Sequence, residues 1–125
     1  MTADAAAILD HPELAPLFGP GSRAEVPLTA VLGNVVIGGQ VDRLVVLPDK
    51  VLVADFKSNR RPPARTEDTP VLYLRQMATY RAVLGTIFPG RRVCCALVWT
   101  RDGMVSMLPD DLLDRHAPGA AGGAA

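Results

Sequence analysis

The sequence has few cysteines, few aromatic residues and no excess of charge of either sign. Its 125 residues include two cysteines and 5% aromatic residues, and 13 basic residues balance 13 acidic ones. Because the charges cancel, no overall field draws the chain to nucleic acid or to an anionic membrane, and any such partner must be held locally. Cys94 and Cys95 are adjacent in an apolar, strand-like run, so they face opposite sides and do not easily bind one ion. We expect both to be core residues.

Long apolar runs and targeting signals are also missing. No apolar run reaches the roughly 18 residues of a membrane-spanning helix. The first residues lack the basic region and the apolar region of a secretory signal peptide. A content of 49% apolar residues is nevertheless enough for a packed core in one domain. We therefore expect a single cytoplasmic domain without a membrane partner.

The central part of the chain reads as three strands, a helix and a further strand. Runs 23–32, 35–47 and 50–57 are rich in β-formers, and the turn pairs Gly33-Asn34 and Pro48-Asp49 separate them, which predicts a three-stranded antiparallel meander. After a polar loop, Thr69 is predicted to be the N-cap of a helix that continues to about residue 86. Run 91–100 is a buried strand, and a short fifth strand at 104–108 is left open. This order predicts an α/β (α+β) fold.

The segments on either side of this core are expected to carry no chemistry. Residues 1–22 are predicted to form a short alanine-rich helix and then a loop, which prolines and glycines punctuate. Residues 23–108 form the core. Residues 109–125, which end in APGAAGGAA, are predicted to be a disordered tail.

The second hairpin is expected to place two carboxylates side by side. If the Pro48-Asp49 turn pairs Leu47 with Lys50, Asp42 lies directly across from Asp55. Such neighbours are about 5 Å apart at Cβ, and like charges at this distance are destabilising.

The first hairpin adds a third carboxylate to this row. If the Gly33-Asn34 turn pairs the residues on either side of it, Glu25 lies across from Asp42. A bulge at Gly38-Gly39 would move Glu25 away from Asp42, whereas the pair formed by Asp42 and Asp55 does not depend on that stretch.

A row of carboxylates on one sheet face is stable if a cation lies over it, and a divalent ion with oxygen ligands fits best. Lys57, two residues after Asp55 on the same face, would reach past the ion toward a phosphate or an attacking water. This combination can cleave a phosphodiester, because the metal neutralises phosphoryl oxygens and lowers the pKa of bound water. The spacing leaves one alternative open, in which these are solvated residues and Lys57 pairs with a carboxylate.

Three segments together resemble the RecB-like nuclease domain of the PD-(D/E)XK superfamily. They are GGQVDRLVV, VADFKSNR and YLRQMATYRAVL. The similarity is greatest to the C-terminal nuclease region of the AddA subunit of bacterial AddAB-type helicase-nucleases, and it covers roughly residues 17–116. The resemblance implies a PD-(D/E)XK core. It also implies that Asp42 and Asp55 bind Mg²⁺ (Mn²⁺ can substitute) with the backbone carbonyl of Phe56, and that Lys57 is the catalytic lysine.

The resemblance also assigns roles to residues outside the strands. Gln76 and Tyr80 match the family's Q-x-x-x-Y signature and share one helical face with Tyr73, since residues three or four apart are neighbours on a helix. Without the family, Gln76 and Tyr80 would be an ordinary pair at a helix edge. Glu25 matches an acidic position whose role in relatives is less uniform.

Arginines near these elements are expected to form a basic rim that contacts DNA phosphates. The alternative is a solvated loop. The aromatic residues Trp99 and Phe88 sit in apolar context and are expected in the core. The five arginines of the predicted rim are Arg43, Arg60, Arg61, Arg65 and Arg75.

Two features of the family are missing from the sequence. Nothing upstream of Glu25 resembles the G-x-x-x-H motif whose histidine completes the metal shell, and His11 is interpreted as a surface residue. The phosphate-binding loop of the helicase motor is absent. The chain therefore resembles the C-terminal piece of a longer polypeptide.

The implied function is a DNA exonuclease that degrades unwound single strands at double-strand breaks, in repair and recombination. Its expected partners are single-stranded DNA ends, the helicase portion of the parent polypeptide and an AddB-type subunit. The alternative is a non-catalytic, nuclease-like module that binds DNA or docks within a larger assembly.

Overall fold

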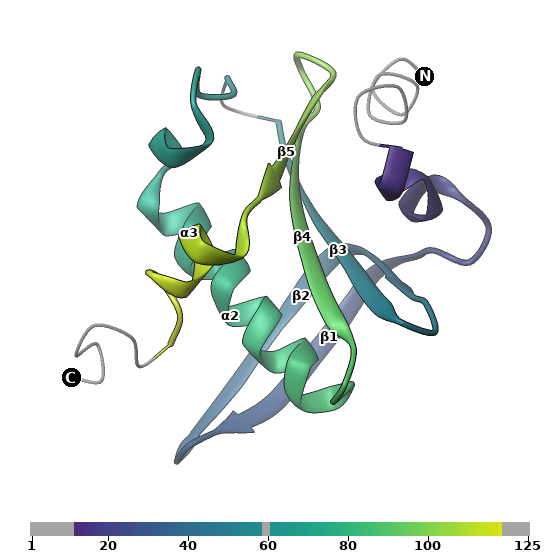
Figure 1. The fold of residues 1–125 in the computed structure, drawn as a ribbon, viewed down its shortest axis with the longest axis vertical. Helices are drawn as coiled ribbons and strands as arrows, with labels where there is room; N and C mark the ends of the chain where they lie inside the picture. Colours follow the sequence, from purple (N-terminus) through teal and green to yellow (C-terminus); the bar gives the residue numbers. More distant parts are fainter. Residues whose placement is uncertain (1–11, 59–60, 119–125) are drawn as a thin grey trace.

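The computed structural model describes residues 12–58 and 61–118, and these form one mixed sheet with helices on both faces (Figure 1). The strands are β1 (Arg23–Leu32), β2 (Val35–Val46), β3 (Lys50–Lys57), β4 (Arg92–Trp99) and β5 (Met104–Leu108), and they follow one another across the sheet in this order. Helix α2 (Val71–Ile87) connects β3 to β4. These two strands are parallel, and the other neighbours are antiparallel. The predicted α+β class is confirmed, and the fifth strand is present.

Both predicted hairpin registers are confirmed. In the second hairpin Arg43 lies across from Ala54, and the Leu47 N–H donates to the Lys50 carbonyl at 2.8 Å. In the first hairpin the pairing runs without a bulge through Gly38 and Gly39. Two-residue turns set these registers, because a slip of one residue would turn every apolar side chain to the wrong face.

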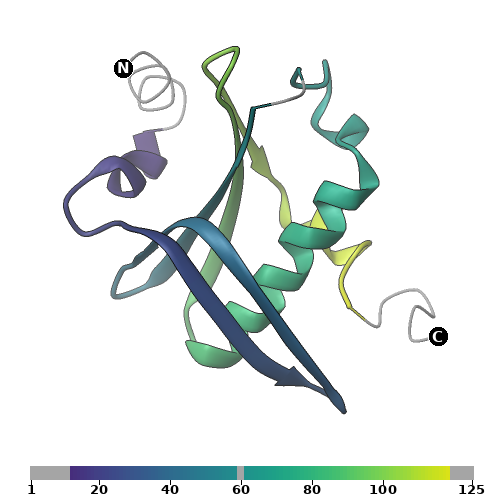
Figure 2. The same ribbon diagram turned by 180° about the vertical axis from the view of Figure 1, so that it is seen from behind.

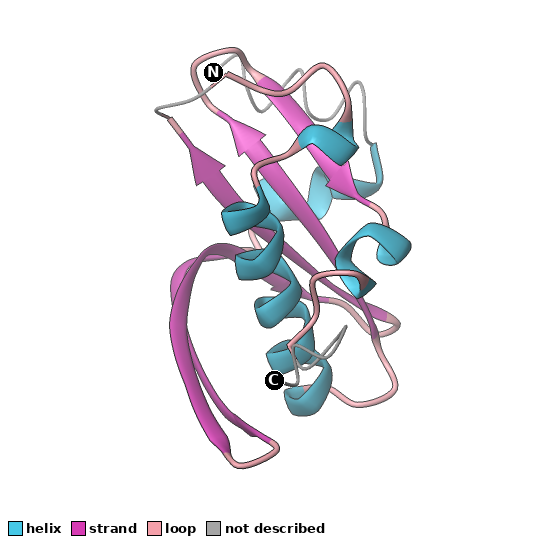
Figure 3. Cartoon of the chain, turned by 90° about the vertical axis from the view of Figure 1, so that its left-hand side faces the viewer, coloured by secondary structure: helices cyan, strands magenta, loops and turns pink. Residues whose placement is uncertain are grey.

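The core is divided between the two faces of the sheet. On one face α2 packs over alternate strand residues that include Leu44, Val53 and the fully buried Trp99. Figure 3 shows α2 lying along this face. On the other face a smaller cluster, which includes Leu52 and Ala54, packs against the helix η1 (Pro12–Phe18), seen from behind in Figure 2. Strand residues that point to the sheet face covered by α2 therefore lie between this helix and the sheet.

Two terminal segments are more ordered than predicted. Instead of a loop, residues 12–18 form the 3-10 helix η1, in which Leu14 and Leu17 are buried. A 3-10 helix has about three residues per turn, so these two leucines point to the same side, toward the sheet. Instead of a disordered tail, residues 110–114 form α3 (Asp110–Asp114). The alanine-rich helix expected within residues 2–10, and the last seven residues, 119–125, lie outside the described residues.

The start of α2 also differs from the prediction. Its N-cap is Pro70, without a side-chain cap, and Thr69 instead donates its hydroxyl to the Thr66 carbonyl at 2.7 Å. Thr69 thus ends the short helix η2 (Thr66–Asp68). The reason is that a residue before proline is pushed into extended backbone, and Thr69 has ψ 135°.

Other core predictions can be compared directly. Cys95 and Trp99 are buried, as expected, while Cys94 and Phe88 are partly buried against the core. In the part of the chain that the structure describes, no helix is long and apolar enough to cross a membrane.

Candidate active site

Asp42, Asp55 and Lys57 come together at the end of β3 on the face covered by α2. The Lys57 Nζ lies 2.6 Å from Asp55 Oδ2, and Asp55 is only 6% exposed. Asp42 is held beside them, because its Oδ2 accepts the Phe56 N–H at 2.7 Å. The register of the second hairpin produces this arrangement, since Asp42 and Asp55 follow directly on the pair formed by Arg43 and Ala54.

The electrostatics of the pair favour a bound cation. Burial raises the pKa of the Asp55 carboxyl above its usual value, the hydrogen bond from Lys57 lowers it, and hydrogen bonding with Asp42 raises it again. The net shift is upward. A buried carboxyl beside a second acidic group therefore resists ionisation, and a divalent cation placed on both would relieve this cost.

A chain of hydrogen bonds connects Lys57 to α2 and back to the sheet. Lys57 donates to Gln76 Oε1 at 3.0 Å, and Gln76 Nε2 donates to the Tyr80 hydroxyl oxygen at 3.4 Å. Tyr80 in turn donates its hydroxyl to the Gln40 carbonyl at 2.9 Å. Burial raises the pKa of Tyr80, so the phenol keeps the proton that it donates. The chain fixes the lysine head relative to both helix and strand.

A glycine allows this close approach. A Cβ at Gly39 would lie 3.0 Å from Tyr80 Cε1 and 3.4 Å from its hydroxyl oxygen. The first of these distances is below an ordinary van der Waals contact, so a larger residue at 39 would displace the ring. The sequence suggested only a possible bulge at Gly39, and its close contact with Tyr80 was not predicted.

Glu25 does not join the carboxylate pair. Its neighbours Ala24 and Val26 keep the predicted ladder with β2, but Glu25 has φ 54° and is exposed. This left-handed backbone interrupts the alternation of side chains that the predicted row requires. Among the described residues, no group of three or more histidine, cysteine or acidic side chains could hold a metal ion. The predicted three-carboxylate row is therefore wrong at Glu25.

The predicted basic rim is only partly brought together. Arg43 pairs with Ala54 and shares its face, where η1 packs, and it donates to Ser22 Oγ at 3.0 Å. The prediction is wrong for Arg43. Adjacent residues of a strand point to opposite faces of the sheet, and Asp42 points to the face that carries the site. Arg61 and Arg65 are exposed, and Arg65 Nε lies 3.6 Å from Glu67 Oε1. Arg60 lies outside the described residues.

Arg75 lies beside the site. It lines a shallow groove of about 280 Å³ between α2 and β2, and its side chain is exposed. Two residues of the hydrogen-bond chain border the same groove, so the groove adjoins the lysine. Its lining residues are Gly38, Leu72, Arg75, Gln76, Thr79 and Tyr80.

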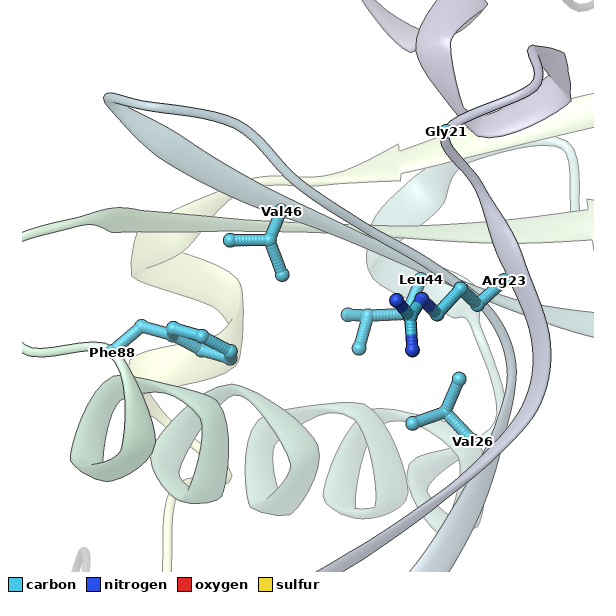
Figure 4. A pocket seen from close by; sticks show the side chains of 6 residues that line it. All are labelled: Gly21, Arg23, Val26, Leu44, Val46 and Phe88. Atoms are coloured by element: carbon cyan, nitrogen blue, oxygen red, sulfur yellow. The ribbon is translucent and has the colours of Figure 1, made fainter.

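A larger pocket of about 390 Å³ is not part of this site. Figure 4 shows it between the strands of the first hairpin and Phe88, at the C-terminal end of α2. None of the predicted site residues lines it, so its size does not mark the chemistry. Its lining residues are Gly21, Arg23, Val26, Leu44, Val46 and Phe88.

The ligands available at the site suit magnesium. Asp42 and Asp55 supply carboxylate oxygens, and Phe56 between Asp55 and Lys57 supplies a main-chain carbonyl. Mg²⁺ is usually held by one or two carboxylates together with waters and substrate phosphates, whereas a structural zinc site needs four nitrogen or sulfur ligands. The oxygen ligands are of the kind that an open divalent-metal site uses, and the described residues offer no set of ligands for a closed zinc site.

A comparison with protein families gives a match over most of the chain. Residues 8–106 match the model of the PD-(D/E)XK nuclease superfamily. The chain belongs to this superfamily. Nucleases of the superfamily generally use divalent metals. A search of curated proteins found no match.

Two solved structures are similar to this PD-(D/E)XK domain, and the first of them shares its fold. A "Putative exonuclease" from Eubacterium rectale superimposes with a TM-score of 0.54 at 17% identity, over 90% of this chain and 45% of its own. A protein named SSO0001 has a TM-score of 0.48 at 15% identity, over 87% of this chain and 55% of its own. The chain thus spans about half the length of these proteins.

Proposed function

We propose that this PD-(D/E)XK domain is a magnesium-dependent exonuclease that acts on DNA, with manganese able to replace magnesium. The observation that carries the proposal is the buried Asp55, which lies beside the partly buried Asp42 and is held against Lys57. Lys57 in turn is fixed by Gln76 and by the chain that ends at Tyr80. Structural ion pairs seldom place a second acidic group beside a buried carboxylate, because that costs stability.

In this proposal each residue has one task. Asp42, Asp55 and the Phe56 carbonyl hold the ion, which, when bound, neutralises phosphoryl oxygens and lowers the pKa of water. Lys57 holds the attacking water or a phosphate oxygen and stabilises the charge that develops there. Gln76 and Tyr80 keep the ammonium directed at that position.

The substrate we propose is a single-stranded DNA end. The groove beside α2 leads to Lys57, and Arg75 at its border offers an exposed guanidinium for a phosphate. Arg61 and Arg65 in the preceding loop are exposed and can add phosphate contacts. Local charges of this kind let a chain with no net charge bind DNA.

The proposed setting is the nuclease part of an AddAB-type helicase-nuclease that processes DNA double-strand breaks in the cytoplasm. Its partners would be the helicase portion of the same polypeptide and an AddB-type subunit. The similarity of the quoted sequence segments to AddA supports this proposal.

A second candidate function is a non-catalytic module that binds DNA or docks within such an assembly. The observation in its favour is that no third acidic, histidine or cysteine ligand joins the two carboxylates among the described residues. Metal binding without strand cleavage would favour this function.

Cleavage of a 5′-labelled single strand tests the primary proposal. With Mg²⁺ or Mn²⁺ we expect degradation by the wild-type chain, and a loss of at least about 100-fold in Asp55→Ala and Lys57→Ala, because each removes a group that acts on the reacting phosphate. Asp102→Ala, in an exposed turn, is the matched control and should cleave normally. Unchanged cleavage in Asp55→Ala or Lys57→Ala would refute the assignment.

A further inference from the structure

We propose that Tyr73 is a positioning residue for Lys57, a role that neither the Q-x-x-x-Y signature nor the metal site includes. The inference rests on the proposed function in one respect, namely that Lys57 acts in cleavage. The Lys57 Nζ lies 4.0 Å from the centroid of the Tyr73 ring. A cation within about 6 Å of an aromatic face is attracted to it, and more strongly when water is excluded. The Lys57 side chain is only 12% exposed.

Among the described residues, three groups contact the ammonium, and a bound ion would affect them differently. Asp55 and Gln76 hold it through polar contacts of 2.6 and 3.0 Å. If Asp55 shared its oxygens with a metal ion, its attraction for Lys57 would weaken, because one negative charge would then serve two cations. The face of the Tyr73 ring offers no ligand atom for the ion, so this contact would persist. Lysine has a flexible stem of four carbons, and a persistent contact limits its freedom.

Tyr73 is itself fixed by a buried aromatic residue. The centroid of its ring lies 6.2 Å from the ring centroid of Trp99, and the angle between the two ring planes is 51°. Trp99 is fully buried and donates its indole N–H to Ser106 Oγ at 2.9 Å. Trp99 is also the partner of Lys57 across the parallel pair of β3 and β4. The lysine and the indole therefore stand side by side, and Tyr73 contacts both from α2.

The alternative is that Tyr73 only fills space between helix and sheet. Tyr73→Phe keeps the ring face and removes the hydroxyl, whereas Tyr73→Leu keeps an apolar side chain and removes the ring. A packing role predicts that both variants hold Lys57 equally well. A positioning role predicts that only Tyr73→Phe does.

The composition of the chain makes a direct measurement simple, because Lys50 and Lys57 are its only lysines. Lysine labelled with ¹³C at Cε gives two NMR signals, which Lys50→Arg assigns. The ring current of Tyr73 should place the Lys57 ε-protons upfield of those of Lys50. We expect this shift to remain in Tyr73→Phe and to disappear in Tyr73→Leu. No upfield shift in the wild type, or an unchanged shift in Tyr73→Leu, would overturn the proposal.

Kinetics then link position to cleavage. We expect Tyr73→Phe to keep kcat within about twofold, and Tyr73→Leu to lose about tenfold in kcat with little change in KM. Near-ultraviolet circular dichroism of each variant confirms the fold. A lost NMR shift with unchanged kcat would refute a positioning role in cleavage. By contrast, equal cleavage by Lys57→Ala and the wild type would refute the proposed function of Lys57, whatever the NMR signals show.

Discussion

At Asp55, burial raises the pKa of the carboxyl group, Lys57 opposes the shift, and Asp42 adds to it. A group whose pKa is raised on folding stabilises the fold below its unfolded pKa, near 3.8 for Asp55, and this stabilisation is lost as the pH rises through the folded value. At neutral pH without metal, the ionised Asp55 therefore lowers stability relative to its protonated form. The same charge is what we propose the metal ion needs, so stability and function conflict at this residue.

We predict that Asp55→Asn is more stable than the wild type at pH 7 in the presence of a chelator. Asparagine keeps the shape of the side chain but cannot ionise, so it removes the cost of a buried charge. The difference should shrink as the pH falls through the raised pKa of the wild-type carboxyl, which then takes up its proton. Urea unfolding at several pH values measures it, with the exposed Asp102→Asn as control. A less stable Asp55→Asn at pH 7 would show that the ion pair with Lys57 outweighs burial.

Gly39 and Gly38 offer a second test at the scale of single residues. A Cβ at Gly39 would press on Tyr80 Cε1 at 3.0 Å, whereas at Gly38 its nearest neighbour would be the Leu28 carbonyl oxygen at 3.8 Å. We predict that Gly39→Ala destabilises the fold by about 1–3 kcal/mol, as expected for overpacking, and slows cleavage. Gly38→Ala should change the stability little. Equal behaviour of the two variants in urea unfolding would contradict the close approach of Tyr80.

The strands and helices show which elements the sequence could predict. The turns at Gly33-Asn34 and Pro48-Asp49 determined both hairpin registers, and with them the proximity of Asp42 to Asp55. Turn chemistry and alternation act locally, so they are visible in the sequence. The parallel pairing of β3 with β4 and the packing of α3 depend on tertiary contacts. The left-handed backbone at Glu25 left no sequence signal, because it is not a glycine, asparagine or aspartate.

Helix α3 illustrates an element that packing creates. It has five residues, too few to be stable alone, but Leu112 and Leu113 are buried. Arg81 of α2 forms ion pairs with Asp110 and Asp114 and connects the two helices. These contacts explain why the segment predicted to be a disordered tail is ordered through α3.

We predict that Leu113→Ala destabilises the domain by about 2–5 kcal/mol, the usual range for truncating a buried leucine. Leu113 is fully buried, so truncating its side chain leaves a cavity in the core. The control is Asp111→Ala, because the Asp111 side chain is 79% exposed and its one ion pair among the described residues is with Arg115 at 3.7 Å. This exposed change should cost less than about 1 kcal/mol. If thermal and urea unfolding give Leu113→Ala the stability of the control, α3 does not pack as described.

At the scale of the whole molecule, the PD-(D/E)XK fold brings the end of β3, the face of α2 and the first hairpin to one place. Asp42, Lys57 and Gln76 come from three separate elements. Gln76 of α2 accepts a hydrogen bond from Lys57, and Asp42 of β2 accepts one from the Phe56 N–H of β3. The chain as a whole carries no net charge, so in the proposed function affinity for DNA would come from the metal site and a few exposed arginines. The central claim is therefore that the two aspartates hold a divalent ion.

Calorimetric titration of Mn²⁺ and then Mg²⁺ into the wild type, Asp42→Asn and Asp55→Asn tests this claim most directly. We predict saturable binding to the wild type that both variants lose. A free metal concentration 100 times the dissociation constant should raise the free energy of unfolding of the wild type by about 2.7 kcal/mol. Equal binding by the wild type and either variant, or no binding to the wild type, would contradict the assignment of Asp42 and Asp55 as metal ligands.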